Sequence, residues 1–324
     1  MNPSLKAVSL IVVIYAASVS AQHVGTIEYT DSKQARITKA ENGLIVSWVA
    51  GRSYDAEGDQ VNIFDELGHP LTKLNVLHLV KEARGVSIYD VTARPDSIIA
   101  MAAVYASKEG NNVTPPVASL LLFDFTGRLL SAFSLEPSHA ILRLALDEKS
   151  NVWTLTDAGD LRDTIDPMIV EYTQDGLLVK EIAIRNLFSS IEVKQDFSFV
   201  WTSMNYDYGR LWIWLSGPAD LITMNTQTDK PTITKTGLPD RANRREVQLS
   251  QVIREPSGDI VAQFREDGKQ GEREIAYYRW SESQMLWSRF KPGACDGERL
   301  IGRGATGQIY ARQRANQTDI CSFH

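Results

Sequence analysis

Short apolar runs alternate with tight-turn residues along nearly the whole chain. The segment Ser119–Asp160 shows the pattern, with turns at Thr126-Gly127 and at Lys149-Ser150-Asn151 and with Leu, Val, Phe and Trp on either side. Apolar or β-branched runs of this length, bounded by Gly, Asn, Asp or Ser, are typical of β-hairpins. The segment therefore predicts four strands, arranged as two hairpins joined by a linker.

One of these hairpins recurs at a nearly constant interval. Its turn is followed each time by an apolar strand, and the first apolar residues are Leu44, Ile98, Val152, Leu211, Ile260 and Ile309. The intervals between them are 54, 54, 59, 49 and 49 residues. A period near 50 residues is typical of repeat architectures in which each repeat packs against the next.

A second hairpin lies between most of these copies. Its turns are Leu67-Gly68, Thr126-Gly127, Asp175-Gly176, Thr228-Asp229 and Glu282-Ser283. Two hairpins per period make four antiparallel strands, and six such repeats predict an all-β fold, a six-bladed β-propeller. Burial between neighbouring blades explains why Leu120–Phe123 and Leu211–Leu215 are apolar at nearly every position.

The two ends of the chain complement each other. After Ile309 there is room for only one more strand, Thr318–Phe323, so the sixth blade is one strand short. Val24–Tyr29 precedes the first blade with no partner of its own. We expect this N-terminal strand to close the last blade, because closure leaves no long unpaired inner edge.

The hairpins resemble those of a known superfamily. Leu121–Gly127 and Ile169–Gly176 look like the outer hairpin of NHL-type propellers, and Leu146–Trp153 and Arg254–Val261 look like the inner one. Residues 24–324 thus resemble six-bladed propellers of the NHL-like and TolB-like superfamily. The resemblance implies a fold; such propellers include binding scaffolds, lactonases, other hydrolases and lyases, so it does not select a function.

The N-terminus has the layout of a signal peptide. Met1–Lys6 carries one positive charge, Ala7–Ala17 is apolar, and Val19-Ser20-Ala21 is a suitable cleavage tripeptide. The apolar run is shorter than the roughly 20 residues that span a bilayer, which disfavours a membrane anchor. We therefore predict a signal peptide at 1–21, one propeller domain at 22–324, export to the periplasm or outside the cell, and no stable membrane insertion after cleavage.

The net charge bears on the class of partner, and the cysteine content bears on disulfide bonding. The formal net charge is −6, and it becomes −7 without the one lysine of residues 1–21. A nucleic-acid partner is not expected, because such proteins usually carry a basic stripe. Cys295 and Cys321 are the only cysteines, and an exported protein with one pair is expected to join them in a disulfide.

No motif marks a catalytic centre. The histidines His23, His69, His78, His139 and His324 form neither HxxxH nor HExxH, and GxSxG is absent. Gly302–Gly307 has GxGxxG spacing, but no helix is expected to follow, so its glycines are interpreted as turn residues. The sequence predicts no catalytic residues and no cofactor.

Two groups of acidic residues raise the question of a metal. Asp157, Asp160, Asp163 and Asp166 recur at every third position; they form either a solvated acidic loop, which is favoured, or a Ca²⁺ loop. Gluconolactonase-like propellers hold a divalent ion with Glu, Asn and Asp from different blades. Residues of these types near strand starts are Glu41, Asp90, Asp147 and Asn205, but no motif marks them as a set and none is assigned as a ligand.

Aromatic residues concentrate in the fourth blade. Trp212 and Trp214 share one strand face and are predicted to be buried between blades, whereas the loop Asn205-Tyr206-Asp207-Tyr208 is predicted to be exposed as a binding surface. Asn112 and Asn316 begin glycosylation sequons, which matter only in a eukaryotic source.

These patterns favour an exported, non-enzymatic scaffold that recognises a protein or glycan partner through loops at one face. The alternative is a metal-dependent hydrolase of the lactonase or esterase type, with a divalent cation in the central channel. An enzyme of that type should bring three or four acidic or amide side chains together at the channel mouth.

Overall fold

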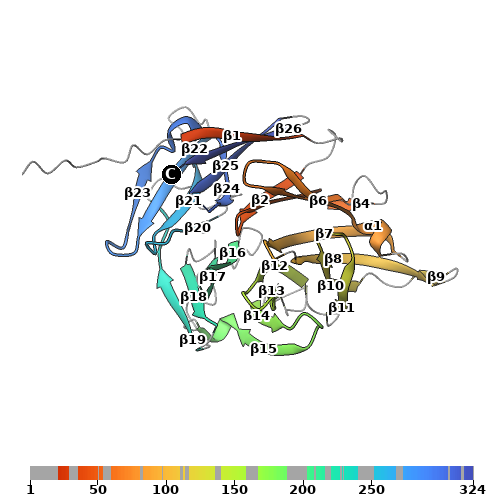
Figure 1. Ribbon diagram of the computed structural model, residues 1–324. Helices are drawn as coiled ribbons and strands as arrows, with labels where there is room; N and C mark the ends of the chain where they lie inside the picture. The colour runs from red at the N-terminus through yellow and green to blue at the C-terminus, as the bar shows by residue number, and fades with distance from the viewer. Residues whose placement is uncertain are drawn as a thin grey trace, which may run out of the picture.

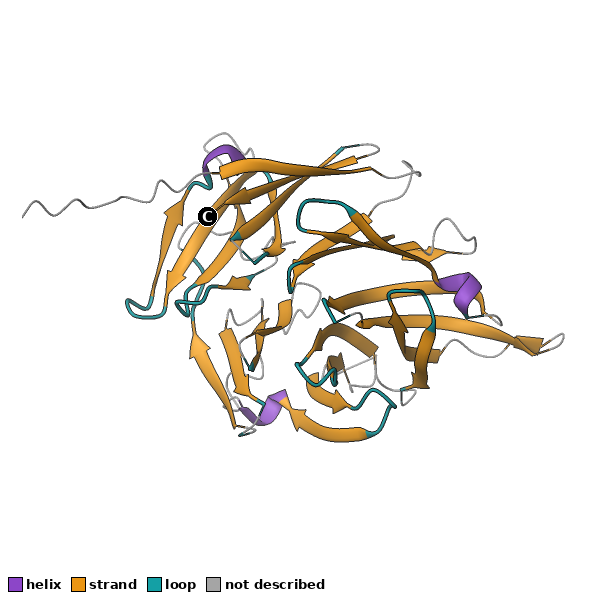
Figure 2. Cartoon of the chain, in the orientation of Figure 1, coloured by secondary structure: helices purple, strands orange, loops and turns teal. Residues whose placement is uncertain are grey.

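β-Strands make up most of the described part of the chain, as the sequence predicts (Figures 1 and 2). The structure is a computed structural model. It describes residues 21–28, 36–49, 51–53, 60–80, 83–96, 98–109, 112–113, 117–135, 140–157, 167–187, 203–207, 209–215, 220–226, 228, 230–239, 252–267, 273–305, 307–314 and 317–323.

The strands form five hydrogen-bonded sheets. The first has eight strands, in the spatial order β1 (Ala21–Glu28), β26 (Gln317–Phe323), β25 (Gln308–Gln313), β24 (Arg299–Arg303), β2 (Arg36–Glu41), β3 (Leu44–Val49), β5 (Gln60–Asp65) and β6 (Pro70–Asn75). The second contains β11 (Leu129–Ser134), β10 (Val117–Asp124), β8 (Ile98–Glu109), β7 (Ala83–Arg94) and β4 (Gly51–Ser53), with β9 (Asn112–Val113) added beside β8.

The other three sheets have four strands each, in chain order. The third sheet consists of β12 (Ala140–Leu146), β13 (Val152–Asp157), β14 (Pro167–Tyr172) and β15 (Leu178–Ala183). The fourth consists of β16 (Ser203–Asp207), β17 (Arg210–Leu215), β18 (Asp220–Asn225) and β19 (Lys230–Lys235). The fifth consists of β20 (Ile253–Arg254), β21 (Ile260–Asp267), β22 (Arg273–Ser281) and β23 (Leu286–Phe290).

Helical structure in the described residues is limited to single turns. These are α1 (Val76–Leu79) and the 3-10 turns η1 (Ile184–Leu187) and η5 (Gly293–Cys295). No helix among them is long and apolar enough to cross a membrane.

The repeat read from the sequence is present in the strands. β3, β8, β13 and β21 begin at the recurring apolar residue, and β17 and β25 begin one residue before it. The second hairpin is also present in five copies, β5/β6, β10/β11, β14/β15, β18/β19 and β22/β23. The periodicity of turns and apolar runs therefore predicted both kinds of hairpin correctly.

The eight-stranded sheet is made of two four-stranded halves. They meet where Ala40 of β2 pairs with Gly302 of β24, and this pair is parallel, whereas the pairs inside each half are antiparallel. A Cβ atom on Gly302 would lie 1.8 Å from the Ala40 carbonyl oxygen, so only glycine allows this approach. Because of this joint the structure has five sheets instead of the six separate ones that the repeat predicts.

Counting the halves separately, and leaving the short strands β4 and β9 of the second sheet aside, gives six four-stranded units. Unit 1 is β2, β3, β5 and β6; unit 2 is β7, β8, β10 and β11; units 3, 4 and 5 are the third, fourth and fifth sheets; unit 6 is β24, β25, β26 and β1. The strand β1 pairs with β26 from Ala21 opposite Phe323 to Glu28 opposite Gln317, so the predicted pairing of the N-terminal strand with the C-terminal one is confirmed. The predicted disulfide between Cys295 and Cys321 is also present and ties η5 to β26.

Hydrophobic residues fill the space between consecutive units. Trp212 and Trp214 of unit 4, for example, are buried against Phe264 and Trp280 of unit 5, as the sequence predicts. Comparable clusters lie between units 1 and 2, 2 and 3, 3 and 4, and 5 and 6. A sixth cluster joins Ile301 and Ile309 of unit 6 to Ile45 of unit 1. The core is therefore a series of layers that returns to its starting point.

Several sequence expectations fall outside the described residues. These are the signal peptide up to Ser20, residue Tyr29, the acidic residues Asp160, Asp163 and Asp166, the aromatic residues Phe197–Trp201 and Tyr208, the histidines His139 and His324, and the sequon residue Asn316.

Candidate functional site

The first strand of each unit faces the middle of the molecule. Figure 1 shows β2, β7, β12, β16, β20 and β24 gathered there, with the other strands of each unit outside them. Arg303 at the end of β24 forms an ion pair of 3.1 Å with Asp207 at the end of β16, although all of unit 5 lies between them in the chain. The turns that follow these inner strands therefore meet at one end of the molecule.

A pocket of about 390 Å³ opens among these turns, and we call it the inner-hairpin pocket. Its lining residues are Asn42, Arg94, Pro95, Leu146, Glu148, Tyr206, Asp207 and Gly209. They come from the inner hairpins β2/β3, β7/β8, β12/β13 and β16/β17, so four units contribute to one wall. A site of this composition exists only when the units are assembled.

The turns around the pocket are held by their own hydrogen bonds. Asp147 accepts bonds from the backbone N–H groups of Lys149 and Asn151, at 2.9 and 2.8 Å. Ser150 in the same turn has a φ of 63°, a left-handed conformation that this pair of bonds supports. These hydrogen bonds fix the backbone of the turn that carries Glu148 at the pocket.

Charged groups of both signs lie in the wall of the pocket. The Tyr206 hydroxyl donates a hydrogen bond to the Glu148 carboxylate. The Arg94 guanidinium donates to the Asp147 carbonyl oxygen and pairs with Asp96 at 3.0 Å. Fixed charges at an accessible hollow are suited to recognising a polar partner, because their orientation is set before binding.

A buried group of charges lies beside the pocket, on β2 and β7. Lys39 Nζ is 2.9 Å from Glu41 and 3.8 Å from Asp90, and all three side chains are buried. Glu41 also accepts a bond of 2.9 Å from the Ala93 N–H, and Asp90 accepts one of 2.8 Å from the Leu144 N–H. The two carboxylates therefore join unit 1 to unit 2 and unit 2 to unit 3.

Burial and ion pairing shift the pKa values of these groups in opposite directions. Burial alone would lower the pKa of the Lys39 ammonium, but the carboxylates of Asp90 and Glu41 outweigh it, so this pKa is raised. Burial raises the pKa of the Glu41 carboxyl in spite of Lys39. Chemically, the ammonium takes the place that a cation would occupy between the two carboxylates, so we interpret the group as structural.

The residues named from the sequence as metal-ligand types do not meet at one point. Glu41 and Asp90 come together around Lys39, Asp147 caps a turn, and the Asn205 amide oxygen accepts the Tyr206 N–H at 3.1 Å. Among the described residues, no group of three or more His, Cys, Asp or Glu side chains could hold a metal ion. The Asp157 backbone ends β13, and its three acidic companions lie outside the described part of the chain.

The predicted binding loop Asn205–Tyr208 is different in the structure. Asn205, Tyr206 and Asp207 belong to strand β16, and Tyr208 lies outside the described residues. The prediction of exposure is wrong for Tyr206, whose exposed fraction is 7% because its ring packs with the apolar cluster between units 3 and 4. Tyr206 and Asp207 nevertheless line the inner-hairpin pocket.

Sequence reasoning missed Asn42, Arg94, Glu148 and Arg303, which complete the pocket and its margin. A signal for them exists, since each lies within six residues before a recurring apolar residue of the repeat. Residues at the same place in each repeat lie at the same end of the molecule, so superposing the six copies would have grouped them.

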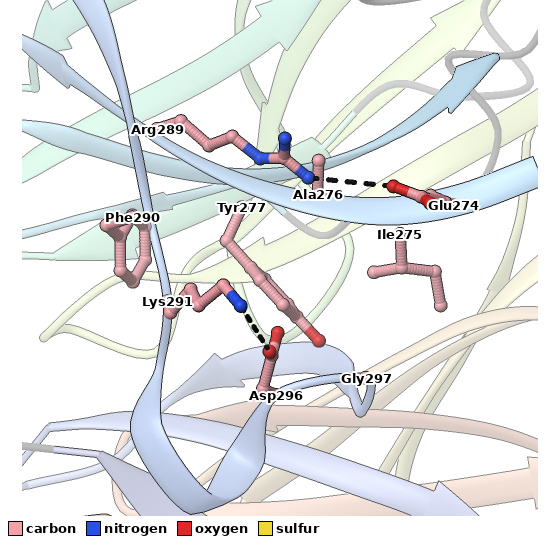
Figure 3. Close-up of a pocket in the computed structure, with 9 residues that line it drawn as sticks. All are labelled: Glu274, Ile275, Ala276, Tyr277, Arg289, Phe290, Lys291, Asp296 and Gly297. Atoms are coloured by element: carbon pink, nitrogen blue, oxygen red, sulfur yellow. Dashed lines mark ion pairs between the residues drawn. The ribbon is translucent and has the colours of Figure 1, made fainter. Parts of the chain in front are cut away.

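A second pocket, of about 440 Å³, lies at the side of the molecule between β22, β23 and the turn after η5 (Figure 3). Figure 3 shows Lys291 and Asp296 pointing toward each other beside the Tyr277 ring, at 3.7 Å. Arg289 pairs with Glu274 at 3.9 Å, and the Tyr277 hydroxyl donates to the Glu298 carbonyl oxygen at 2.5 Å. Burial raises the pKa of that hydroxyl. The lining of this pocket comes from one stretch of the chain, residues 274–297, whereas four units line the inner-hairpin pocket. We therefore favour the inner-hairpin pocket as the functional site.

Comparison with known proteins gives a likeness of fold. No protein-family model matches the sequence, and the search of curated proteins found no match. A Bacteroides fragilis protein described as exported superposes with a TM-score of 0.52 and 8% identity, over 94% of each chain. A Dyadobacter fermentans protein of unknown function superposes with a TM-score of 0.50 and 10% identity, over 94% of this chain and 99% of that one. At these identities the likeness concerns the fold alone.

Proposed function

We propose that the protein is an exported six-bladed β-propeller that binds a protein or glycan partner, without catalysis, through the face that carries the inner-hairpin pocket. Each four-stranded unit would be one blade, with β1 completing the sixth. The six hydrophobic clusters support this arrangement, because each lies between consecutive units and the last joins unit 6 to unit 1.

Contacts at the outer strands support closure in the same way. In units 2 and 3 the turn glycine of the outer hairpin lies against the outer strand of the preceding unit: a Cβ on Gly127 would be 3.4 Å from Leu74, and one on Gly176 would be 2.7 Å from Phe133. Gly68 of unit 1 has the same relation to Ile27 of β1, at 3.4 Å. The first and sixth units therefore share the kind of contact that joins unit 1 to unit 2 and unit 2 to unit 3.

The observation that carries the binding function is the composition of the pocket. Four units supply Asn42, Arg94, Glu148 and Asp207 to one open hollow, and no cluster of metal-ligand side chains accompanies them in the described residues. Carboxylates, a guanidinium and an amide are the groups that bind the hydroxyls of a glycan or the polar rim of a protein interface.

Export is supported by the signal-peptide layout of residues 1–21. The Cys295–Cys321 disulfide agrees with it, because disulfides persist in oxidising compartments.

Partner capture tests the proposal. The mature protein, residues 22–324, would be immobilised and exposed to the exported fraction of its source cells and to a glycan array. The variants Arg94→Gln and Asp207→Asn change the pocket, and Arg128→Gln on the exposed outer hairpin is the matched control. We expect at least tenfold weaker binding for the pocket variants and unchanged binding for the control.

Two results would contradict the proposal. One is a captured partner whose affinity is the same for the pocket variants and the wild type. The other is turnover of lactones or esters that depends on an added divalent cation, which would favour the hydrolase alternative.

A further inference from the structure

The charges in the wall of the inner-hairpin pocket differ in how far other side chains neutralise them. Arg94, Glu148 and Asp207 are the three charged residues that line the pocket. The Arg94 guanidinium forms an ion pair of 3.0 Å with Asp96 and also donates a hydrogen bond to the Asp147 carbonyl oxygen. The Asp207 carboxylate forms an ion pair of 3.1 Å with Arg303. Two of the three charges therefore have counter-ions within the fold.

The third charge, the Glu148 carboxylate, has a different environment. Within the described part of the chain it forms no ion pair, and it accepts a hydrogen bond from the Tyr206 hydroxyl. The Tyr206 ring is fixed by its packing between units 3 and 4, so its hydroxyl orients the carboxylate. Glu148 itself is exposed at the pocket. An oriented carboxylate without a counter-ion is an acceptor for an ammonium or a guanidinium group.

The uncharged part of the wall suits the stem of a basic side chain. Pro95 of unit 2 and Leu146 of unit 3 line the same pocket as Glu148. Lysine and arginine lay their methylene groups along apolar surface while the cationic end stays with a polar partner. The pocket thus combines an apolar wall with one carboxylate that lacks a counter-ion.

The turns around the pocket add an excess of acidic charge. Successive strands of a unit are antiparallel, so the turns of its inner and outer hairpins lie at the same end of the molecule. Among the described residues of the inner turns, Lys149 is the one basic residue and five are acidic: Asp96, Asp147, Glu148, Glu255 and Asp259. In the described outer turns, Arg128 is the one basic residue and three are acidic: Glu66, Asp175 and Glu282.

The strand residues that flank these turns do not cancel this excess. Five of them are basic, and four are acidic: Glu41, Asp65, Asp124 and Asp207. The end of the molecule that carries the pocket is therefore acidic as a whole. A surface of this kind attracts a partner of opposite charge and raises the rate of encounter with it.

We propose that the inner-hairpin pocket receives a lysine or arginine side chain of a protein partner, with the cationic end bound by Glu148. This inference rests on the binding function proposed for the pocket, and it identifies the partner as a protein with a basic contact surface. A protein is favoured over an amino sugar because the acidic turns extend over several units around the pocket. A protein surface can cover that area, whereas one sugar residue covers only the pocket.

NMR titration of the isotopically labelled mature protein, residues 22–324, tests the site with small probes. The cationic probes are N-acetyl-lysine amide and N-acetyl-arginine amide, and N-acetyl-norleucine amide is the control with a stem and no charge. Methyl glucosaminide represents an amino sugar. All solutions are kept at one ionic strength, because salt screens exposed charges. We expect saturable shifts of backbone amides in residues 147–151 and 205–207 with a cationic amide and none with the norleucine amide.

The variant Glu148→Gln removes the charge and keeps the shape of the side chain. We expect at least tenfold weaker binding of the cationic amides, with an unchanged melting temperature because the side chain is exposed. Glu181→Gln, the same change on the exposed outer strand β15, is the matched control and should bind like the wild type. Glu148→Asp, which keeps the charge on a shorter stem, should have intermediate affinity.

Three results would overturn the inference. They are the absence of saturable binding for both cationic amides, equal affinity in the wild type and Glu148→Gln, and tighter binding of methyl glucosaminide than of either amide, which would assign the pocket to an amino sugar.

The capture experiment separates this inference from the proposed function. A partner that is lost from Arg94→Gln and Asp207→Asn but bound fully by Glu148→Gln would leave the proposed function intact and contradict the role of Glu148. Binding of the amides that depends on Glu148, with no partner captured, would support the cation site and count against the wider binding function.

Discussion

At the scale of single residues, an aspartate side chain accepts hydrogen bonds from the turn backbone in hairpins of both kinds. Asp65, Asp124 and Asp147 each accept the backbone N–H groups two and four residues later, at 2.8 to 3.0 Å. The carboxylate satisfies two donors that a tight turn would otherwise expose to water. These aspartates could be found in the sequence because they stand at a fixed distance before the turn residues.

Asp124 gives a pH dependence with a definite sign. Hydrogen bonds, first from the Thr126 side chain, lower the pKa of its carboxyl below the ordinary 3.8. A carboxyl with a lowered pKa in the folded state contributes stability above its unfolded pKa, and this contribution is lost as the pH falls through the folded pKa. We expect the NMR titration midpoint of Asp124 to lie below 3.8 and to rise in Thr126→Ala. A midpoint at or above 3.8 in the wild type would contradict the hydrogen-bond assignment.

The charges around Lys39 should be strongly coupled. Lys39→Met leaves the buried carboxylates of Glu41 and Asp90 without their ammonium, which should lower the free energy of unfolding by about 3–5 kcal/mol. Adding Glu41→Gln removes one of the stranded charges, so the double variant should be more stable than Lys39→Met alone. Urea unfolding of the two single variants and the double variant measures this coupling. Additive losses would show that the ion pair does not exist.

At the scale of elements, glycine decides how closely the first and last units approach. A Cβ at Gly302, where φ is +149°, would collide with the Ala40 carbonyl oxygen. We expect Gly302→Ala to lower the free energy of unfolding by roughly 2–5 kcal/mol through overlap and backbone strain. Gly237→Ala is the control: its φ of +58° costs about 1 kcal/mol, but its Cβ would contact nothing. Equal losses in urea unfolding would mean that the β2–β24 contact is not formed.

The disulfide also stabilises unit 6, because it joins η5 to β26. It closes a chain segment with a sequence separation of 26 residues and holds β26, the strand that pairs with β1. Loop-closure entropy for a segment of that length corresponds to about 3.5 kcal/mol. The double variant Cys295→Ala/Cys321→Ala should lose this amount in urea unfolding, with faster amide hydrogen exchange in β1 and β26 than in β13. Exchange that rises equally in all units would show that the disulfide does not act locally.

The strands also show which features of the fold the sequence predicts and which it does not. Strand starts at Leu44, Ile98, Val152 and Ile260 could be predicted because turn chemistry and apolar runs are local signals. The short strand β4 could not, since it leaves unit 1 to pair with β7 of unit 2 and its sequence does not name its partner. Tyr206 was misjudged for a similar reason, because its burial depends on packing between units 3 and 4.

The whole molecule explains why the candidate site was only partly predictable. Tyr206 and Asp207 were singled out as part of one predicted loop, whereas Arg94 and Glu148 come from two other units and meet them only in the assembled fold. Side chains of one unit hold the next unit in place by accepting hydrogen bonds from its backbone N–H groups. Glu41 accepts from Ala93, Asp90 from Leu144, and Ser203 from Val252 at 3.1 Å. The geometry of the pocket is thus a property of the assembled units.

If the units form a closed ring, the position of the chain ends in it should matter little. Ala21 lies opposite Phe323 in the β1–β26 pair, so the ends of the described chain are neighbours. A circular permutant that joins residue 323 to residue 22 by a short glycine-rich linker, with new ends between Pro239 and Val252, keeps all six units intact. Closed domains tolerate such changes when the new ends lie between structural units. We expect the same circular-dichroism spectrum and one cooperative unfolding transition. As a control, a permutant opened inside β17 should lose stability, because that strand is buried. If the first permutant unfolds in two steps while the wild type unfolds in one, unit 6 does not close on unit 1 as a blade would.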